Sequence, residues 1–120
     1  MDEEWPSEEI PNADTLFMRA HKSHLATGQL AAGVFKDING GMSTNWEKYC
    51  TAQEALAKAK VPADNGIIRM VVGRVREIPL EVKHTPLSGD LSHTDVIGTK
   101  NTEVRLKLLG IYSWAIKWGG

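Results

Sequence analysis

The chain has 120 residues, of which 42% are hydrophobic and 24% charged, and its formal net charge is −1. These values are close to globular averages, and the length fits one domain of about 100–150 residues. The single cysteine, Cys50, excludes an intramolecular disulfide framework, and no apolar run reaches the roughly 18–20 residues that span a bilayer.

Charge is distributed unevenly along the chain. The first 14 residues carry six acids and no lysine or arginine, whereas the rest holds nine acids and all fourteen bases. An acidic start is the opposite of a signal peptide's basic region, so we expect a cytoplasmic protein that does not enter membranes. We predict a flexible acidic arm over residues 1–14 and one domain over residues 15–120. In an alternative interpretation, the arm covers a basic surface until an anionic partner displaces it.

The first half of the chain predicts two strands and a helix. Apolar residues alternate with polar ones over 16–21, which predicts a strand. The apolar run 29–35 precedes the Asn39-Gly40-Gly41 turn and predicts a second strand, paired with the first as a hairpin. Thr51 and Glu54 form a capping-box pattern that opens a short central helix.

The second half predicts further strands and a longer helix. Residues 67–72, 80–84 and 94–97 have strand-like patterns, and the pattern is lost over 73–76. Helical spacing of apolar residues from Thr102 to Trp118 predicts a longer C-terminal helix. The fold class is therefore α+β, with a mostly antiparallel sheet of four to five strands packed with the two helices.

Candidate binding residues cluster on the first strand and near two later turns. Arg19 and His21 lie two residues apart, so they share a strand face and offer donors to a phosphate or carboxylate. His84 and His93 flank a loop, where acid–base chemistry and ordinary loop capping are the two alternatives. The turn at Thr99 precedes a helix and favours an anion.

Trp46 and Tyr49 follow a glycine-rich turn and either stack on a ligand ring or pack beneath the turn. The histidine spacing fits no familiar metal site, and no cofactor motif occurs, so we expect neither a metal nor a cofactor. The basic residues Arg69, Arg74 and Arg76 give too small a charge excess to favour nucleic acid as a partner.

Five short motifs together resemble a family of small, stand-alone bacterial proteins of unassigned function. The resemblance covers about residues 14–100, and it implies a compact bacterial cytosolic protein whose polar groups belong to one site. Asn45 stands where the pattern leads us to expect an acid, which removes support for a carboxylate role there. The motifs are Arg19-x-His21, Ala32-x-x-Phe35-Lys36-Asp37, Ser43-x-x-Trp46-x-Lys48-Tyr49, His84-x-Pro86 and Ser92-His93-x-x-Val96-x-Gly98.

Three functions remain open on these grounds. The first is a binding or accessory protein that recognises an anionic small molecule or peptide group. The second is a small transferase or phosphoester-acting enzyme with histidine as acid or base and Arg19 as anion holder. The third is an interaction module that forms a homodimer or docks a partner through the C-terminal helix, with Trp114 and Trp118.

Overall fold

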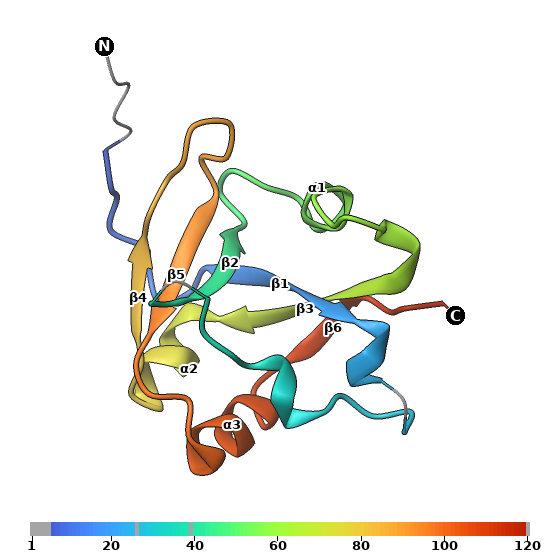
Figure 1. The fold of residues 1–120 in the computed structure, drawn as a ribbon. Helices are drawn as coiled ribbons and strands as arrows, with labels where there is room; N and C mark the ends of the chain where they lie inside the picture. The colour runs from blue at the N-terminus through green and yellow to red at the C-terminus, as the bar shows by residue number, and fades with distance from the viewer. Residues whose placement is uncertain (1–5, 26, 39, 120) are drawn as a thin grey trace.

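A computed structural model describes residues 6–25, 27–38 and 40–119. Within these ranges six strands form one antiparallel sheet in the order β4-β5-β2-β1-β3-β6 (Figure 1). The strands are β1 (Thr15–His21), β2 (Met42–Trp46), β3 (Asn65–Val71), β4 (Glu81–His84), β5 (His93–Ile97) and β6 (Ser113–Ile116). The helices are α1 (Ala52–Ala57), α2 (Val72–Glu77) and α3 (Thr102–Leu109), with short 3-10 turns η1 (Lys22–His24), η2 (Ala32–Val34) and η3 (Pro62–Asp64). The α+β class is confirmed, and the sheet has more strands than the four to five predicted.

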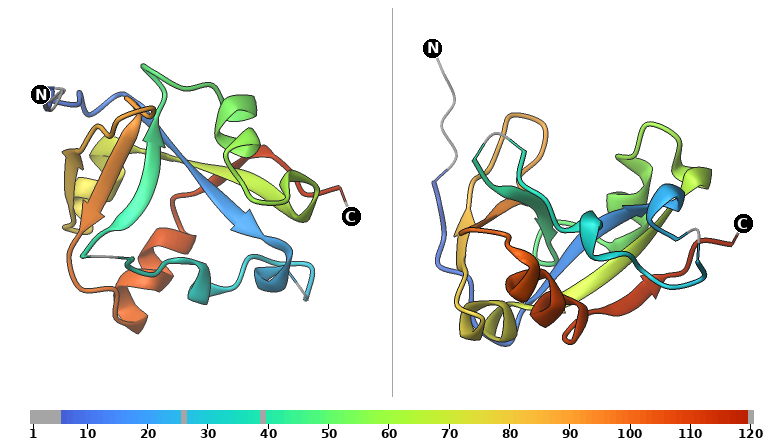
Figure 2. Two further views of the ribbon diagram at one scale, coloured as in Figure 1. Left: turned by 45° about the horizontal axis from the view of Figure 1, so that its top comes forward. Right: turned by 60° about the horizontal axis from the view of Figure 1, so that its bottom comes forward.

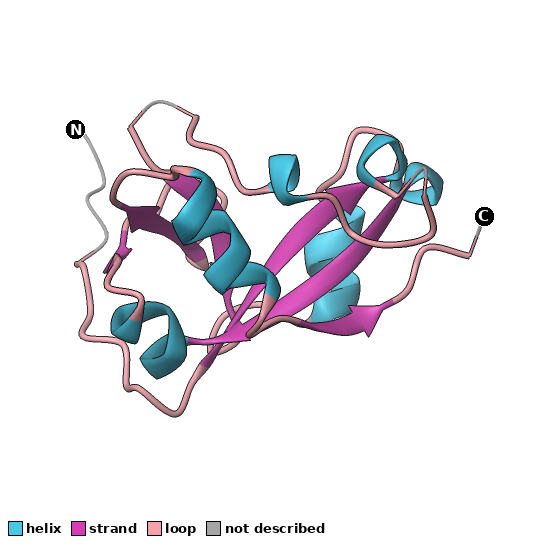
Figure 3. Cartoon of the chain, turned by 90° about the horizontal axis from the view of Figure 1, so that it is seen from below, coloured by secondary structure: helices cyan, strands magenta, loops and turns pink. Residues whose placement is uncertain are grey.

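Helices cover both faces of the sheet. Alternation in β1 buries Leu16, Met18 and Ala20 on one face, where the main core forms beneath α2 and α3. Figure 3 shows α2 and α3 in front of the strands and α1 behind them. On the other face, a smaller cluster forms under α1, around Cys50 and Ile67. No helix in the described part of the chain is long and apolar enough to cross a membrane.

The sheet consists of two halves that cross. Figure 2 shows β4, β5 and β2 running across the direction of β1 and β3. β1 pairs with β3 along all seven of its residues, but with β2 only at Leu16↔Trp46 and Phe17↔Asn45. Beyond these two pairs, residues 18–21 of β1 and 42–44 of β2 diverge. The divergence creates a gap near the middle of the sheet.

The predicted hairpin of residues 16–21 and 29–35 is wrong. Residues 29–35 contain η2 and irregular backbone in place of a strand, and β1 pairs instead with β2 and β3. Ala31, Ala32 and Gly33 supply little side chain for a pleated surface, which disfavours a strand. The buried Leu30 and Phe35 anchor the segment over the main core.

The C-terminal helix is shorter than predicted, because it ends at Leu109 and not near Trp118. Gly110 is the C-cap, and its N–H donates to the carbonyls of Leu106 and Lys107. The following strand β6 contacts both hydrophobic clusters: Trp114 packs on the main core, and Ala115 and Ile116 pack on the cluster under α1. β6 pairs with β3 with a register shift between Ile67 and Ile68, so it does not follow a strict period of two. Pairing with β3 therefore overrides the helical spacing that the same residues satisfy.

Two local patterns near the helices had different outcomes. The capping box is confirmed: the Thr51 hydroxyl accepts from the Glu54 N–H, and the Glu54 carboxylate accepts from the Thr51 N–H. The segment without a pattern after β3 forms α2, which buries Val72 and Val75 in the main core.

Residues 6–14 lie against the domain. The Ile10 side chain is only 3% exposed and belongs to the main core. Arg76 donates to the Ile10 carbonyl at 2.7 Å and to the Asn12 side chain at 2.6 Å. Glu8 accepts from Lys48 and from the Tyr49 hydroxyl, and Lys48 is the main cause of the lowered pKa of Glu8. The flexible arm predicted over 1–14 is therefore not found from Glu8 onward, and residues 1–5 lie outside the described residues.

Candidate functional site

The gap between β1 and β2 holds a pocket of about 450 Å³. We call it the gap pocket; its walls are Met18, Arg19 and His21 of β1 and residues 42–45 of β2, and three residues of the loop before β2 line it as well: Val34, Lys36 and Ile38. Because the gap passes through the sheet, its lining includes side chains from both faces. This volume lies within the roughly 300–1,000 Å³ range of small-molecule sites.

The gap pocket is rich in basic side chains. Arg19, His21, His24, Lys36 and His93 all line it. Among the described residues, neither Arg19 nor Lys36 forms a salt bridge with a carboxylate. Two cationic side chains that have no carboxylate partner in the described part of the chain favour an anionic ligand in this pocket.

Lys36 is presented by a loop that a buried cation anchors. The Lys100 side chain is 2% exposed, and its Nζ donates to Asp37 Oδ1 at 2.7 Å and to the carbonyls of Val96 and Gly98. Removing Asp37 would leave the buried Lys100 ammonium without its carboxylate partner, which is costly for a buried charge. The contact thus holds the loop beside Lys36 against the end of β5.

His21 offers a hydrogen-bond donor to the pocket. The Ser23 N–H donates to His21 Nδ1 at 3.1 Å, so Nδ1 is unprotonated in the neutral ring. The proton of the neutral ring is therefore on Nε2. Both His21 and Arg19 thus present N–H groups on the same face of β1.

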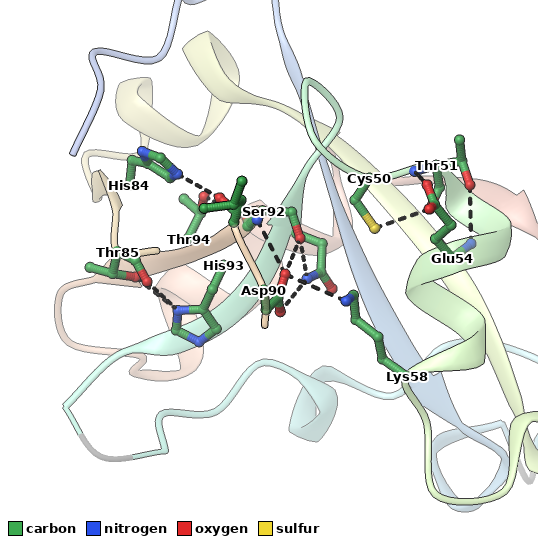
Figure 4. A network of polar contacts seen from close by, with 12 residues as sticks. Cys50, Thr51, Glu54, Lys58, His84, Thr85, Asp90, Ser92, His93 and Thr94 are labelled. Atoms are coloured by element: carbon green, nitrogen blue, oxygen red, sulfur yellow. Dashed lines mark hydrogen bonds and ion pairs between the residues drawn. The ribbon is translucent and has the colours of Figure 1, made fainter. Parts of the chain in front are cut away.

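His93 has the opposite tautomer. Its Nδ1 lies 3.0 Å from the Thr85 carbonyl, which can only accept, so Nδ1 carries the proton (Figure 4). In the neutral ring Nε2 then has a free lone pair, 4.0 Å from Asp95 Oδ1. His21 and His93 therefore supply a donor and an acceptor to the same pocket.

The pKa of His24 is lowered in this pocket, first by burial and then by neighbouring positive charge. Burial lowers the pKa of His24, and the nearby charges of Lys36 and His21 lower it further. Both effects disfavour the imidazolium form. A bound anion would oppose the two charge effects and raise the pKa of His24 again.

Among the residues that the structure describes, one carboxylate lines the gap pocket, and protein groups compensate its charge. Asp90 accepts from the Ser92 hydroxyl at 2.6 Å and from the Asn45 amide at 3.3 Å, and Lys58 Nζ lies 3.5 Å from it (Figure 4). Burial alone would raise the pKa of Asp90, but the bonds from Ser92 and the charge of Lys58 hold the pKa below its usual value. Asp90 therefore does not cancel the charge of Arg19 and Lys36.

Cys50 lies in the small cluster under α1. Its thiol donates to the Thr51 carbonyl, and burial raises the pKa of the Cys50 thiol. A raised pKa keeps the sulfur in its less nucleophilic form. The structure therefore gives Cys50 no catalytic feature.

The structure brings together three of the six residues predicted for the site: Arg19, His21 and His93. Trp46 is 1% exposed in the core, and its indole N–H donates to Asp14 at 2.9 Å. Thr99 is exposed and outside the gap pocket, and Asn101 caps the α3 N-terminus close to it.

His84 has a structural role, because both ring nitrogens have protein partners. It is 3% exposed, its Nδ1 accepts from the Glu8 N–H at 2.9 Å, and its Nε2 donates to the Leu91 carbonyl at 2.7 Å. The ring also packs against Trp46 and Tyr49. His84 therefore connects the segment around Glu8 to the β4–β5 hairpin.

The six residues predicted for the site do not include Lys36 and His24. In the sequence, Lys36 stands only in the motif Ala32-x-x-Phe35-Lys36-Asp37 of the resemblance, and His24 only in the histidine spacing that fits no familiar metal site. No group of three or more potential metal ligands occurs among the described residues. The usable signal was the short distance in sequence between His21 and His24, which one turn of η1 brings to one side of the chain.

A second hollow, of about 300 Å³, adjoins the gap pocket and shares three lining residues with it. We call it the side pocket; it is lined by residues 59–61, Asp64 and Asn65, together with Arg19 and His21. The Asp64 carboxylate is paired with Lys22 at 3.1 Å. Arg19, His21 and Asn65 therefore line both hollows.

Comparison of the chain with models of protein families, with curated proteins and with solved structures finds no match.

Proposed function

We propose that this protein is a small cytoplasmic binding protein whose gap pocket holds an anionic small molecule. The observation that supports this most directly is the convergence of Arg19, Lys36 and three histidines on one hollow in which the single carboxylate is already compensated. Arg19 presents a planar fork suited to phosphate or carboxylate. The His21 Nε2–H adds a further donor on the same strand face.

The pocket also suits an anion that carries an organic group. Met18, Val34 and Met42 line its inner part, and the 57% exposed Ile38 lines its rim. Methionine side chains adapt to irregular apolar shapes. A phosphate ester of an organic molecule therefore fits the lining better than inorganic phosphate does.

Acid–base catalysis is the second candidate function, because His21 and His93 have opposite tautomers in one pocket. His93 Nε2 is available to take a proton, and positive charge nearby would stabilise a developing anion. Among the described residues, however, Cys50 is buried with a raised pKa and no metal cluster occurs. Binding therefore has more support than catalysis.

The interaction module requires a C-terminal helix that includes Trp114 and Trp118, and α3 ends before both residues. α3 ends at Leu109, and Trp114 and Trp118 lie on or after β6. Both side chains are partly buried, and the Trp118 indole donates to the Ala63 carbonyl. They do not form the apolar helix face that docking required.

Arg19→Ala tests the binding proposal. In a thermal-shift assay, adenosine 5′-monophosphate should stabilise the wild-type protein, and Arg19→Ala should weaken binding about 10-fold to 100-fold, since hydrogen bonds to charged groups contribute about 1.5–3 kcal/mol. The unliganded variant should keep its melting temperature, because Arg19 is exposed and without an ion pair in the described structure.

Arg74→Ala is the matched control, because Arg74 is an exposed arginine outside both hollows. It should leave binding unchanged. If no phosphate-bearing ligand stabilises the wild-type protein, or if Arg74→Ala weakens binding as much as Arg19→Ala, the proposed function is wrong.

A further inference from the structure

The gap pocket and the side pocket adjoin at three polar residues that line both hollows, and we call these three residues the ridge. β1 lies between β2 and β3 in the sheet, and Arg19, His21 and Asn65 line both hollows. His21 and Asn65 are also paired across the two strands. A ligand that fills both hollows must therefore cross the chain at Arg19 and His21.

Arg19 and His21, where such a ligand would cross the chain, carry N–H donors that have no protein partner among the described residues. In the described residues Arg19 has no carboxylate partner, and His21 has its Nε2–H free because Nδ1 is occupied by Ser23. The carboxylate of each hollow already has a lysine partner, Asp90 with Lys58 and Asp64 with Lys22. Positive charge is therefore uncompensated at the ridge between the hollows.

Each hollow adds a lysine and an exposed apolar side chain to this ridge. The gap pocket has Lys36 and Ile38, and the side pocket has Lys60 and Val61. Ile38 is 57% exposed and Val61 is 49% exposed. Each hollow has at least the roughly 300 Å³ of the smaller ligand pockets in proteins, so each has room for an organic group.

We propose that the ligand is a phosphodiester, with its phosphate at Arg19 and His21 and one esterified organic group in each hollow. This inference rests on the proposed function and specifies its ligand. A monoester has its charge at one end and would leave the side pocket empty. A diester has a single charge in the middle, which matches donors placed between two hollows.

The test compares a monoester with two diesters on the full chain. Calorimetric titration with adenosine 5′-monophosphate, with adenylyl-(3′→5′)-adenosine and with glycerophosphocholine gives a Kd for each. At least one diester should bind about 10-fold or more tightly than the monoester, because only a diester gains contacts in the side pocket. The diester that binds more tightly identifies a nucleotide or a lipid headgroup as the source.

Variants on each side of the ridge locate the two organic groups. Lys60→Ala and Val61→Ser should weaken diester binding about 3-fold to 10-fold and leave monoester binding unchanged, whereas Ile38→Ser should weaken both. Val71→Ser and Leu106→Ser are the matched controls, because these exposed apolar residues line neither hollow.

The outcomes separate this inference from the proposed function. If the monoester binds and neither diester binds more tightly, or if Lys60→Ala weakens both classes equally, the phosphodiester inference is overturned and the anion site remains. If no phosphate ester binds at all, both are overturned.

Discussion

Side chains alternate between the two faces of the sheet along β1, and this alternation places Arg19 and His21 on the same face. Side chains at i and i+2 of a strand share a face, and the burial of Leu16, Met18 and Ala20 on the other side fixes which face that is. What surrounds Arg19 and His21 comes from distant segments: Lys36 from a loop and His93 from β5. Their chemistry as a group thus depends on contacts that are remote in sequence.

His24 should make folding stability depend on pH. Its pKa is lowered by burial and by the charges of Lys36 and His21, so the unfolded chain, with a pKa near 6.5, binds the proton more readily. The contribution is complete above about pH 6.5 and is lost as the pH falls through the lower pKa of the folded state. Urea unfolding at pH 7.5 and pH 5.5 should therefore show a smaller loss of stability in His24→Gln than in the wild type.

Lys36→Met provides the second arm of the His24 experiment. Removing the Lys36 charge should raise the pKa of His24 and reduce the pH dependence in part. Asp90 does not interfere, since its pKa is already below the ordinary carboxyl range. An unchanged pH dependence in both variants would show that His24 is not desolvated in the folded protein.

At the scale of elements, the gap pocket exists because β1 pairs with β2 at only two residue pairs. β1 pairs with β3 over seven residues, and β2 pairs with β5 over four, so most of the pairing of β1 and β2 is with these strands and not with each other. The two halves of the sheet meet at two residue pairs, and strand twist carries them apart from there. The gap pocket is a consequence of that divergence.

α3 is held by its buried face, and Leu108 is the residue that tests this. Leu108 is fully buried in the main core, while Leu106 on the same helix is 58% exposed. Leu108→Ala should cost about 2–5 kcal/mol in the free energy of unfolding, as a buried large-to-small change. Leu106→Ala should cost much less, and denaturant unfolding measures both. Equal losses of unfolding free energy in the two variants would show that α3 does not pack on this core through Leu108.

At the scale of the whole molecule, the segment before β1 is part of the core. Ile10 is buried with residues of β1, β2 and α2, and Glu8, Asn12 and Asp14 make contacts with three other segments. The acidic composition of residues 1–14 predicted a flexible arm. The prediction failed from Glu8 onward because charge composition describes local preference and contains no information on tertiary contacts. The segment is ordered here by a small number of tertiary contacts.

Ile10→Ala should therefore destabilise the protein. We expect a cost of about 2–5 kcal/mol, because the side chain is almost fully removed from water. Ile38→Ala is the control, with the same substitution at a side chain that is 57% exposed. Thermal and urea unfolding measure both variants; comparable stability of Ile10→Ala and wild type would mean that residues near Ile10 are dispensable, as the sequence alone suggested.

The sequence by itself determined the features that depend on neighbours within a few residues. These are the strand over 16–21 and its two faces, the capping box at Thr51 and Glu54, and the α+β class. Each follows from periodicity or from a side chain that bonds to nearby backbone. The same rules could not choose between helix and strand for Tyr112–Ile116, because the segment is apolar at both spacings.

Only the tertiary structure decided which of these side chains meet. It placed His84 and Trp46 in the core, and it brought Lys36 and His93 from distant segments to the pocket that Arg19 lines. The physical reason is that pairing between distant strands is set by the burial of the whole sheet, which no short window of sequence contains.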